Sequence, residues 1–138
     1  AYWVGDSTKI INCKGDANYG PLLFVEGSNV DVELFIYPAE SDRLVHSLIT
    51  VLGENNKVVL KTADLKNRKK ELPILVGYTP PLHGESMSPY SEAAVNNLNL
   101  INKTGMPITI GKMARNCIIE TNGTIKENKG ENNQIIKN

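Results

Sequence analysis

The sequence has little of the chemistry that marks the common enzyme and metal-binding classes. It contains two histidines and two cysteines in 138 residues, and neither pair has the short spacing that a zinc site or a redox motif requires. No serine stands in a Gly-x-Ser-x-Gly sequence, and the scattered aspartates do not match a calcium-binding loop. The sequence therefore predicts no catalytic residue, no metal site and no cofactor.

Long apolar runs and an excess of one charge are also missing. No apolar stretch approaches the roughly 18 residues that span a bilayer. Lys and Arg number 15 and so do Asp and Glu, which gives a net charge of zero. A neutral chain lacks the general electrostatic attraction on which nucleic-acid binding depends. With 41% hydrophobic residues the chain is too apolar for a disordered segment, so we expect one globular domain that neither inserts into membranes nor binds nucleic acid.

Aromatic residues are scarce, while turn-forming and β-branched residues are abundant. Two Phe and one Trp stand against 16 Asn, 13 Ile, 11 Gly and 7 Pro. Asn, Gly and Pro supply the backbone angles of tight turns, and Ile and Val favour strands. The composition predicts a protein of many short strands.

The clearest strand covers residues 30–37. Val30, Val32, Leu34 and Ile36 alternate with acidic Asp31 and Glu33, which is the pattern of a strand with one face in the core. Pro38 then ends the ladder. We expect a central strand with its even-numbered residues buried.

Turn signals then suggest hairpins. Residues 44–52 favour a strand, with a helix as the alternative, and the turn cluster 53–56 leads to a second strand at 57–62. The Asn-Gly dipeptide within 121–124 predicts another hairpin. Nine or so short strands, with no internal repeat, predict an antiparallel β-sandwich of immunoglobulin-like architecture. We expect residues 1–127 to form this single domain and residues 128–138 to be a polar, mobile C-terminal tail.

The two cysteines point to an oxidising compartment. Cys13 and Cys117 lie near opposite ends of the chain beside Ile pairs that could form neighbouring terminal strands. We therefore expect a disulfide between them, with two separate buried thiols as the alternative. Together with a start at Ala1, which is compatible with a removed signal, this predicts an extracytoplasmic protein. Two glycosylation sequons, at Asn102 and Asn122, are interpreted first as turns.

The long segment 79–91 is the first candidate for a working surface. It holds three prolines and a glycine, and unstructured connections of this length are often functional. We expect Leu82, His83 and Tyr90, with Tyr78 at its start, to form a binding site. His83 lies near Glu85, Ser86 and Ser88, which leaves a small hydrolase or inhibitor as an alternative.

The resulting expectation is a secreted or cell-surface binding module. An adhesin or pilus-type subunit would bind a protein or glycan receptor, or other subunits of a surface assembly. Two alternatives remain: a small extracytoplasmic hydrolase or inhibitor that acts around His83, and a viral or parasite surface domain.

Overall fold

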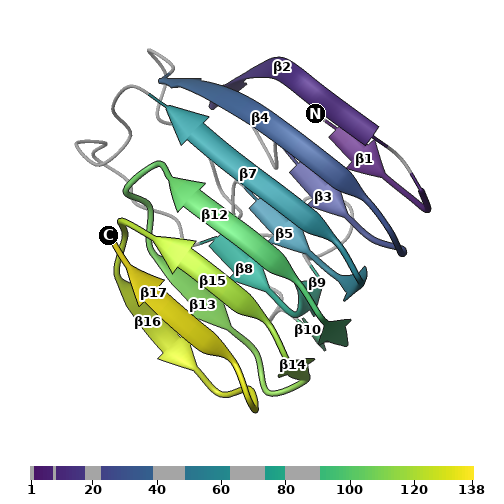
Figure 1. Cartoon of the computed structure of the whole chain (residues 1–138), viewed down its shortest axis with the longest axis vertical. Coiled ribbons are helices and arrows are strands. Elements are labelled where there is room, and N and C mark those ends of the chain that lie inside the picture. The colour runs from purple at the N-terminus through teal and green to yellow at the C-terminus, as the bar shows by residue number, and fades with distance from the viewer. Residues whose placement is uncertain (1, 8, 18–22, 39–48, 63–73, 80–90) are drawn as a thin grey trace.

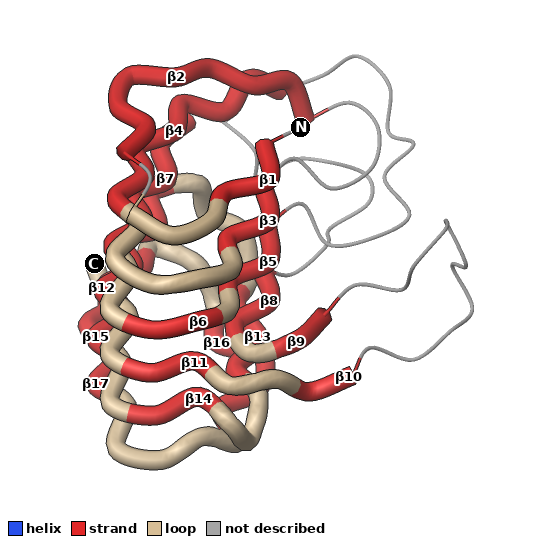
Figure 2. Tube along the Cα trace, turned by 90° about the vertical axis from the view of Figure 1, so that its right-hand side faces the viewer, coloured by secondary structure: helices blue, strands red, loops and turns tan. Residues whose placement is uncertain are grey.

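The chain forms a solenoid of parallel β-strands. The computed structural model describes residues 2–7, 9–17, 23–38, 49–62, 74–79 and 91–138. These residues form six coils stacked along the long axis (Figure 2). Each coil contributes one strand to sheet A and one to sheet B, and the two sheets enclose the core (Figure 1).

Sheets A and B contain six strands each. Sheet A consists of β1 (Tyr2–Val4), β3 (Leu23–Val25), β5 (Ile49–Val51), β8 (Ile74–Val76), β13 (Ile108–Ile110) and β16 (Ile125–Asn128). Sheet B consists of β2 (Lys9–Ala17), β4 (Asp31–Pro38), β7 (Lys57–Thr62), β12 (Asn99–Lys103), β15 (Ile118–Thr121) and β17 (Gln134–Lys137). Every pairing within the two sheets is parallel.

Two smaller sheets complete the coils. Sheet C joins β6 (Gly53–Glu54), β11 (Val95–Asn96) and β14 (Ala114–Arg115) in parallel, at the corner that leads into sheet B. The fourth coil also carries an antiparallel pair, β9 (Tyr78–Thr79) with β10 (Ser91–Glu92). This pair is the stem on either side of residues 80–90.

The expected antiparallel sandwich is wrong, because the turn clusters bend the chain around a corner instead of reversing it. Residues 53–56 lead from sheet A to the adjoining sheet B, so β5 and β7 are not partners. The Asn-Gly turn within 121–124 likewise connects β15 of sheet B with β16 of sheet A. Both hairpins are therefore corrected. A strand meets its sheet partner only after one full coil, which makes the pairing parallel.

A residue with positive φ makes the same corner in every coil. These residues are Ser7, Asn29, Asn55, Asn97, Asn116 and Asn132, with φ between 56° and 60°. Asparagine tolerates this left-handed conformation better than other residues with a side chain. Each stands two positions before the first paired residue of a sheet B strand, so the strand register stacks all six.

The stacked corners reveal an internal repeat that the sequence analysis did not find. A glycine stands two residues before the turn residue in four coils, at Gly5, Gly27, Gly53 and Gly130. Val95 and Ala114 occupy this position in the other two coils. The connections between corners differ in length, so the repeat has no fixed period.

The core lies between the sheets and is aliphatic. Strand β4 confirms its expected orientation, with Val32, Leu34 and Ile36 fully buried. The largest fully buried side chains are Leu23, Leu34, Ile36, Ile49, Leu60, Ile74, Leu98, Leu100, Ile108 and Ile110. Among the residues described with side chains, most of the core is Ile, Leu and Val, which explains how a chain poor in Phe folds.

Asparagines that directly follow the positive-φ residue hold the corner backbone in two of the coils. Asn56 Oδ1 accepts the Val30 N–H at 2.8 Å, and its Nδ2 donates to the carbonyl groups of Gly27 and Leu52, both at 3.0 Å. Asn133, at the equivalent place in the last coil, accepts the Cys117 N–H at 2.9 Å. These side chains satisfy backbone groups that would otherwise be buried without partners.

The two sequons differ in structure: Asn102 lies within β12, so its interpretation as a turn residue is wrong, whereas Asn122 lies in the connection between β15 and β16. Asn102 is fully buried, and its Nδ2 donates to the Met106 carbonyl and to Thr121 Oγ1, both at 2.9 Å. Asn122 is exposed, and its Oδ1 accepts the Gly105 N–H at 2.7 Å.

The domain boundary expected at residue 127 is absent. Strand β17 pairs with β15 over four residues and extends sheet B, so residues 128–138 belong to the last coil. Polar residues occupy inward positions there: Asn128 pairs with Ile110, and Lys137 pairs with Thr121 while its Nζ donates to the Gly123 carbonyl at 2.6 Å. Inward polar residues at a sheet edge disfavour further strand pairing, so this coil has the character of a cap.

The expected disulfide is also wrong. Cys117 is a free, buried thiol. Strand β2, which contains Cys13, is separated in sheet B from β15 by β4, β7 and β12. Four strand spacings amount to about 19 Å, whereas a disulfide requires Cα atoms less than about 7 Å apart. Burial raises the pKa of the Cys117 thiol, so it is also a poor nucleophile.

Candidate functional site: the outer face of sheet B

Of the four residues expected to bind a partner, the structure describes only Tyr78. Leu82, His83 and Tyr90 lie outside the described residues. Tyr78 lies in β9 and is only 9% exposed, so it does not present an open aromatic surface. Its ring lies against the backbone of Gly111. Burial is the main cause of its raised pKa, and a hydrogen bond to Glu92 adds to it.

Tyr78 and Glu92 form an anchor for the β9–β10 stem. They are register partners across the antiparallel pair. Glu92 Oε1 accepts the Lys112 N–H at 3.1 Å, and Glu92 Oε2 lies 3.2 Å from Lys112 Nζ. The backbone hydrogen bond is the main reason that the pKa of Glu92 is lowered. Because Glu92 is already occupied in this way, the cluster is suited to fixing the two ends of segment 80–90 and not to proton transfer.

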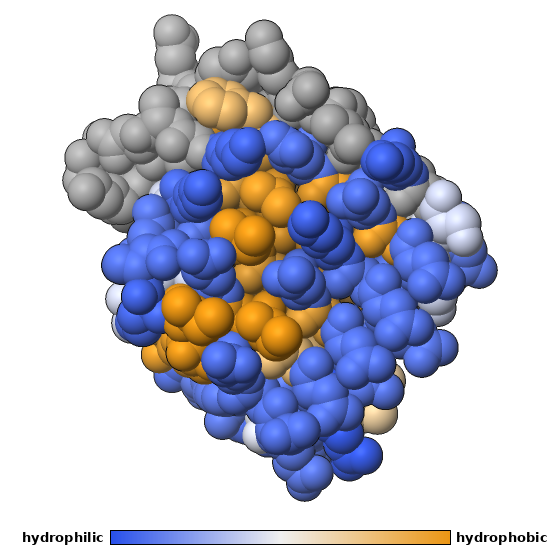
Figure 3. Space-filling model, viewed as in Figure 1, coloured by the Kyte–Doolittle hydropathy of each residue, from blue (hydrophilic) through white to orange (hydrophobic). Residues whose placement is uncertain are grey.

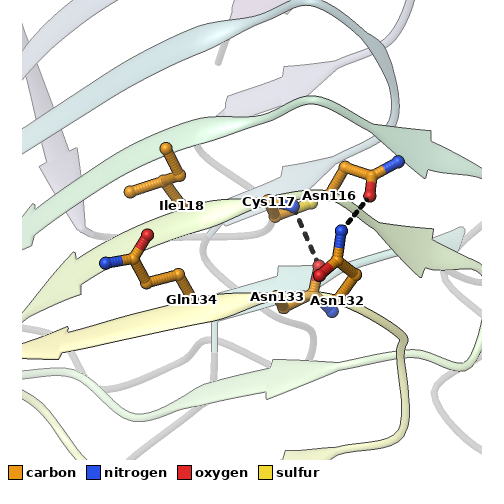
Figure 4. A pocket seen from close by; sticks show the side chains of 6 residues that line it. All are labelled: Asn116, Cys117, Ile118, Asn132, Asn133 and Gln134. Atoms are coloured by element: carbon orange, nitrogen blue, oxygen red, sulfur yellow. Dashed lines mark hydrogen bonds between the residues drawn. The ribbon is translucent and has the colours of Figure 1, made fainter.

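A small hollow lies between the corners of the last two coils. It has a volume of about 320 Å³ and is lined by Asn116, Cys117, Ile118, Asn132, Asn133 and Gln134 (Figure 4). Asn132 Nδ2 donates to Asn116 Oδ1 at 2.6 Å, and Asn133 holds the Cys117 backbone. The polar groups bind one another here, so the hollow serves the stacking of the coils.

The strongest candidate is an aliphatic stripe on the outer face of sheet B. It consists of Val59 on β7, Ile101 on β12, Ile118 on β15 and Ile136 on β17. Ile118 is 46% exposed and Ile136 is 39% exposed, while Val59 and Ile101 are half-buried. In Figure 3 hydrophobic side chains gather over these strands with hydrophilic ones around them.

The register places the stripe on four adjacent strands. Val59 pairs with Ile101, Ile101 with Glu120, and Glu120 with Ile136. Ile118 stands two residues before Glu120 and therefore on the same face, diagonal to Ile101 and Ile136. The four apolar residues lie in two neighbouring rows of the register, which also hold Asn99, Gln134 and Glu120. Exposed apolar residues that gather on one face often mark binding sites.

Charges of both signs surround the stripe. Lys61 Nζ lies 2.7 Å from Glu33 Oε1, which ties β7 to β4 on this face. Lys57 and Lys103 are exposed, and Glu120 is half-buried within the row of the stripe. Among the described side chains, this face carries Lys9, Lys57, Lys61 and Lys103 together with Asp31, Glu33 and Glu120. The face would therefore suit a partner that also carries charges of both signs.

The outer face of sheet A differs from that of sheet B. The register aligns Phe24, Thr50 and Leu75 on its outer side, yet all three are buried. The hydroxyl group of Thr50 has no hydrogen-bond partner. This part of sheet A therefore does not present an open apolar surface.

The aliphatic stripe could not be predicted from the sequence. Val59 lies in the segment 57–62 that was expected to be a strand, but only the parallel register places it beside Ile101 and Ile118. Which residues are neighbours on this outer face depends on how the coils stack.

Comparison with known proteins does not assign a function. No protein family matches the chain, and no curated protein matches it. Among the described residues, three or more His, Cys, Asp or Glu side chains never gather into a metal-binding group. No helix within the described ranges is long and apolar enough to cross a membrane.

Proposed function

We propose that the chain is a binding module and that the outer face of sheet B engages a protein partner. The exposed aliphatic stripe carries this proposal, because solvent-exposed Ile residues on neighbouring strands form a flat apolar surface. An aliphatic surface with a charged rim is typical of protein contacts. The stripe contains none of the aromatic side chains on which sugar rings stack, so it favours a protein over a glycan.

The parallel solenoid supports the proposal by holding the face rigid. Each strand of the stripe is hydrogen-bonded to neighbours, and the inward residues Val58, Leu100 and Ile119 on β7, β12 and β15 are fully buried. A rigid surface loses little conformational entropy on binding. The extracytoplasmic location stays a prediction, now without the disulfide that supported it. Binding through Leu82, His83 and Tyr90 also stays a prediction.

Site-specific photo-crosslinking tests the proposed face. A benzophenone amino acid at position 136 reports on the stripe, and the same probe at position 113 is the matched control. Met113 is 42% exposed and lies outside sheet B. In an extract of the source cells we expect a discrete protein adduct from position 136 and none from position 113.

Competition decides whether the adduct reflects specific binding. Excess unlabelled protein should remove the adduct, while excess Ile118→Lys protein should not, because a buried unpaired charge opposes binding. Equal adducts from positions 136 and 113, or competition by the Ile118→Lys protein equal to that of the unmodified protein, would contradict the proposal.

A further inference from the structure

We infer that the partner on the outer face of sheet B is a second copy of this chain, bound face to face about a two-fold axis. This inference rests on the proposed function of the aliphatic stripe. It identifies the partner from the arrangement of charges in the strand register.

The stripe has a natural centre between β12 and β15. Its four strands lie in the order β7, β12, β15 and β17 in sheet B. A two-fold axis parallel to the strands at this centre places β12 over β15 of the second copy and β7 over β17. The two-fold operation makes every such contact twice, as in a closed dimer.

This arrangement makes an apolar contact between Val59 and Ile136 and a mixed contact between Asn99 and Ile118. Val59 and Ile136 lie in the same row of the register, because Val59 pairs with Ile101, Ile101 with Glu120, and Glu120 with Ile136. The rotation therefore places Val59 of one copy over Ile136 of the other. Asn99 and Ile118 are register partners, so they also face each other across the axis.

The charges are compatible with the same arrangement. Lys57 faces Gln134 of the second copy, because both belong to the row that contains Asn99 and Ile118. Lys103 is the next outward-facing residue after Ile101 on β12. The rotation places Glu120 of the second copy over Ile101. Each Lys103 therefore comes close to a Glu120 of the other copy, and no like charges face each other among these four strands.

A two-fold axis across the strands and an end-to-end contact are both less favourable. A two-fold axis perpendicular to the strands through the row of Val59 and Ile101 places Glu33 over Glu33 and Glu120 over Glu120. Like charges that face each other oppose binding. End-to-end stacking meets the polar inward residues Asn128 and Lys137 of the last coil. The face-to-face dimer centred between β12 and β15 avoids both conflicts.

Analytical ultracentrifugation of the purified chain tests the inference. The contact is small, so we expect a monomer–dimer equilibrium with a dissociation constant between about 10 μM and about 1 mM. Ile136→Lys should weaken association at least about 10-fold, because it places a charge over Val59. Met113→Lys, which changes an exposed residue outside sheet B, should leave association unchanged.

A charge exchange identifies the orientation. Glu120→Lys and Lys103→Glu should each weaken the dimer, and the double variant should restore it, because both contacts between copies become attractive again. Circular dichroism should confirm the fold of each variant, and Ile118→Lys replaces Ile136→Lys if the latter fails to fold.

Three outcomes would overturn the inference. A chain that is monomeric at about 1 mM contradicts the dimer, while the proposed function would stand if position 136 still crosslinked to a different protein. A dimer that Ile136→Lys leaves intact uses another surface. Assemblies that grow beyond the dimer with concentration indicate open stacking instead of a closed pair.

Discussion

Replacing Gly53 with alanine is expected to destabilise the chain by about 3 kcal/mol or more. Gly53 has a φ of +90°, and a Cβ atom there would lie 1.9 Å from the Gly27 carbonyl oxygen. That oxygen belongs to the corner backbone of the neighbouring coil, so it cannot move without disturbing the stack. Chemical denaturation measures the loss as a lower midpoint.

Gly5→Ala is the matched control. Gly5 occupies the same position relative to its turn residue, Ser7, and a Cβ atom there would meet no atom within 4 Å. We expect a change within about 0.5 kcal/mol. Equal effects at Gly5 and Gly53 would show that the corners of the second and third coils do not pack as described.

Asn56→Leu should produce a loss of similar size for a different reason. The substitution removes hydrogen bonds to the Val30 N–H and to the carbonyl groups of Gly27 and Leu52. A buried polar group without a partner costs about 1 to 3 kcal/mol, so we expect a total loss of about 3 kcal/mol or more. Leu98 is the equivalent residue in the fourth coil and is buried there. The shape of a leucine side chain is therefore compatible with this position.

Asn99→Leu provides the comparison for Asn56→Leu. Asn99 is exposed at the start of β12, and we expect its substitution to change the free energy of unfolding by less than about 0.5 kcal/mol. Thermal or urea unfolding of both variants measures the difference. If Asn56→Leu left the free energy of unfolding nearly unchanged, water or a shifted backbone would have to satisfy the Val30 N–H and the carbonyl groups of Gly27 and Leu52.

The sequence was sufficient for local features with strong periodicity. Val32, Leu34 and Ile36 alternate with acidic or half-exposed residues, and the burial of one strand face follows from that alternation alone. The abundance of Asn and Gly also indicated many turns correctly. These features depend on residues that are close in sequence.

The direction of the turns could not be read from the same residues. Gly53 and Asn55 favour positive φ both in a hairpin and at a solenoid corner. The decisive information is the recurrence of glycine and asparagine two positions apart in successive coils. Connections of unequal length hide this recurrence from a search for a fixed period. The aliphatic stripe was missed for the same reason, because it exists only once the coils are stacked.

Scalar couplings across hydrogen bonds, measured by NMR, test the stacked coils most directly. The structure predicts couplings from the N–H of Lys57 to the Val30 carbonyl, Asn99 to Asn56, Ile118 to Leu98, and Gln134 to Cys117, at 2.8 to 2.9 Å. These four bonds join five successive coils at the same corner. Observing them would establish the parallel register that creates the outer face of sheet B. Couplings between residues 49–52 and 57–62 in an antiparallel pattern would contradict the solenoid, and with it the aliphatic stripe.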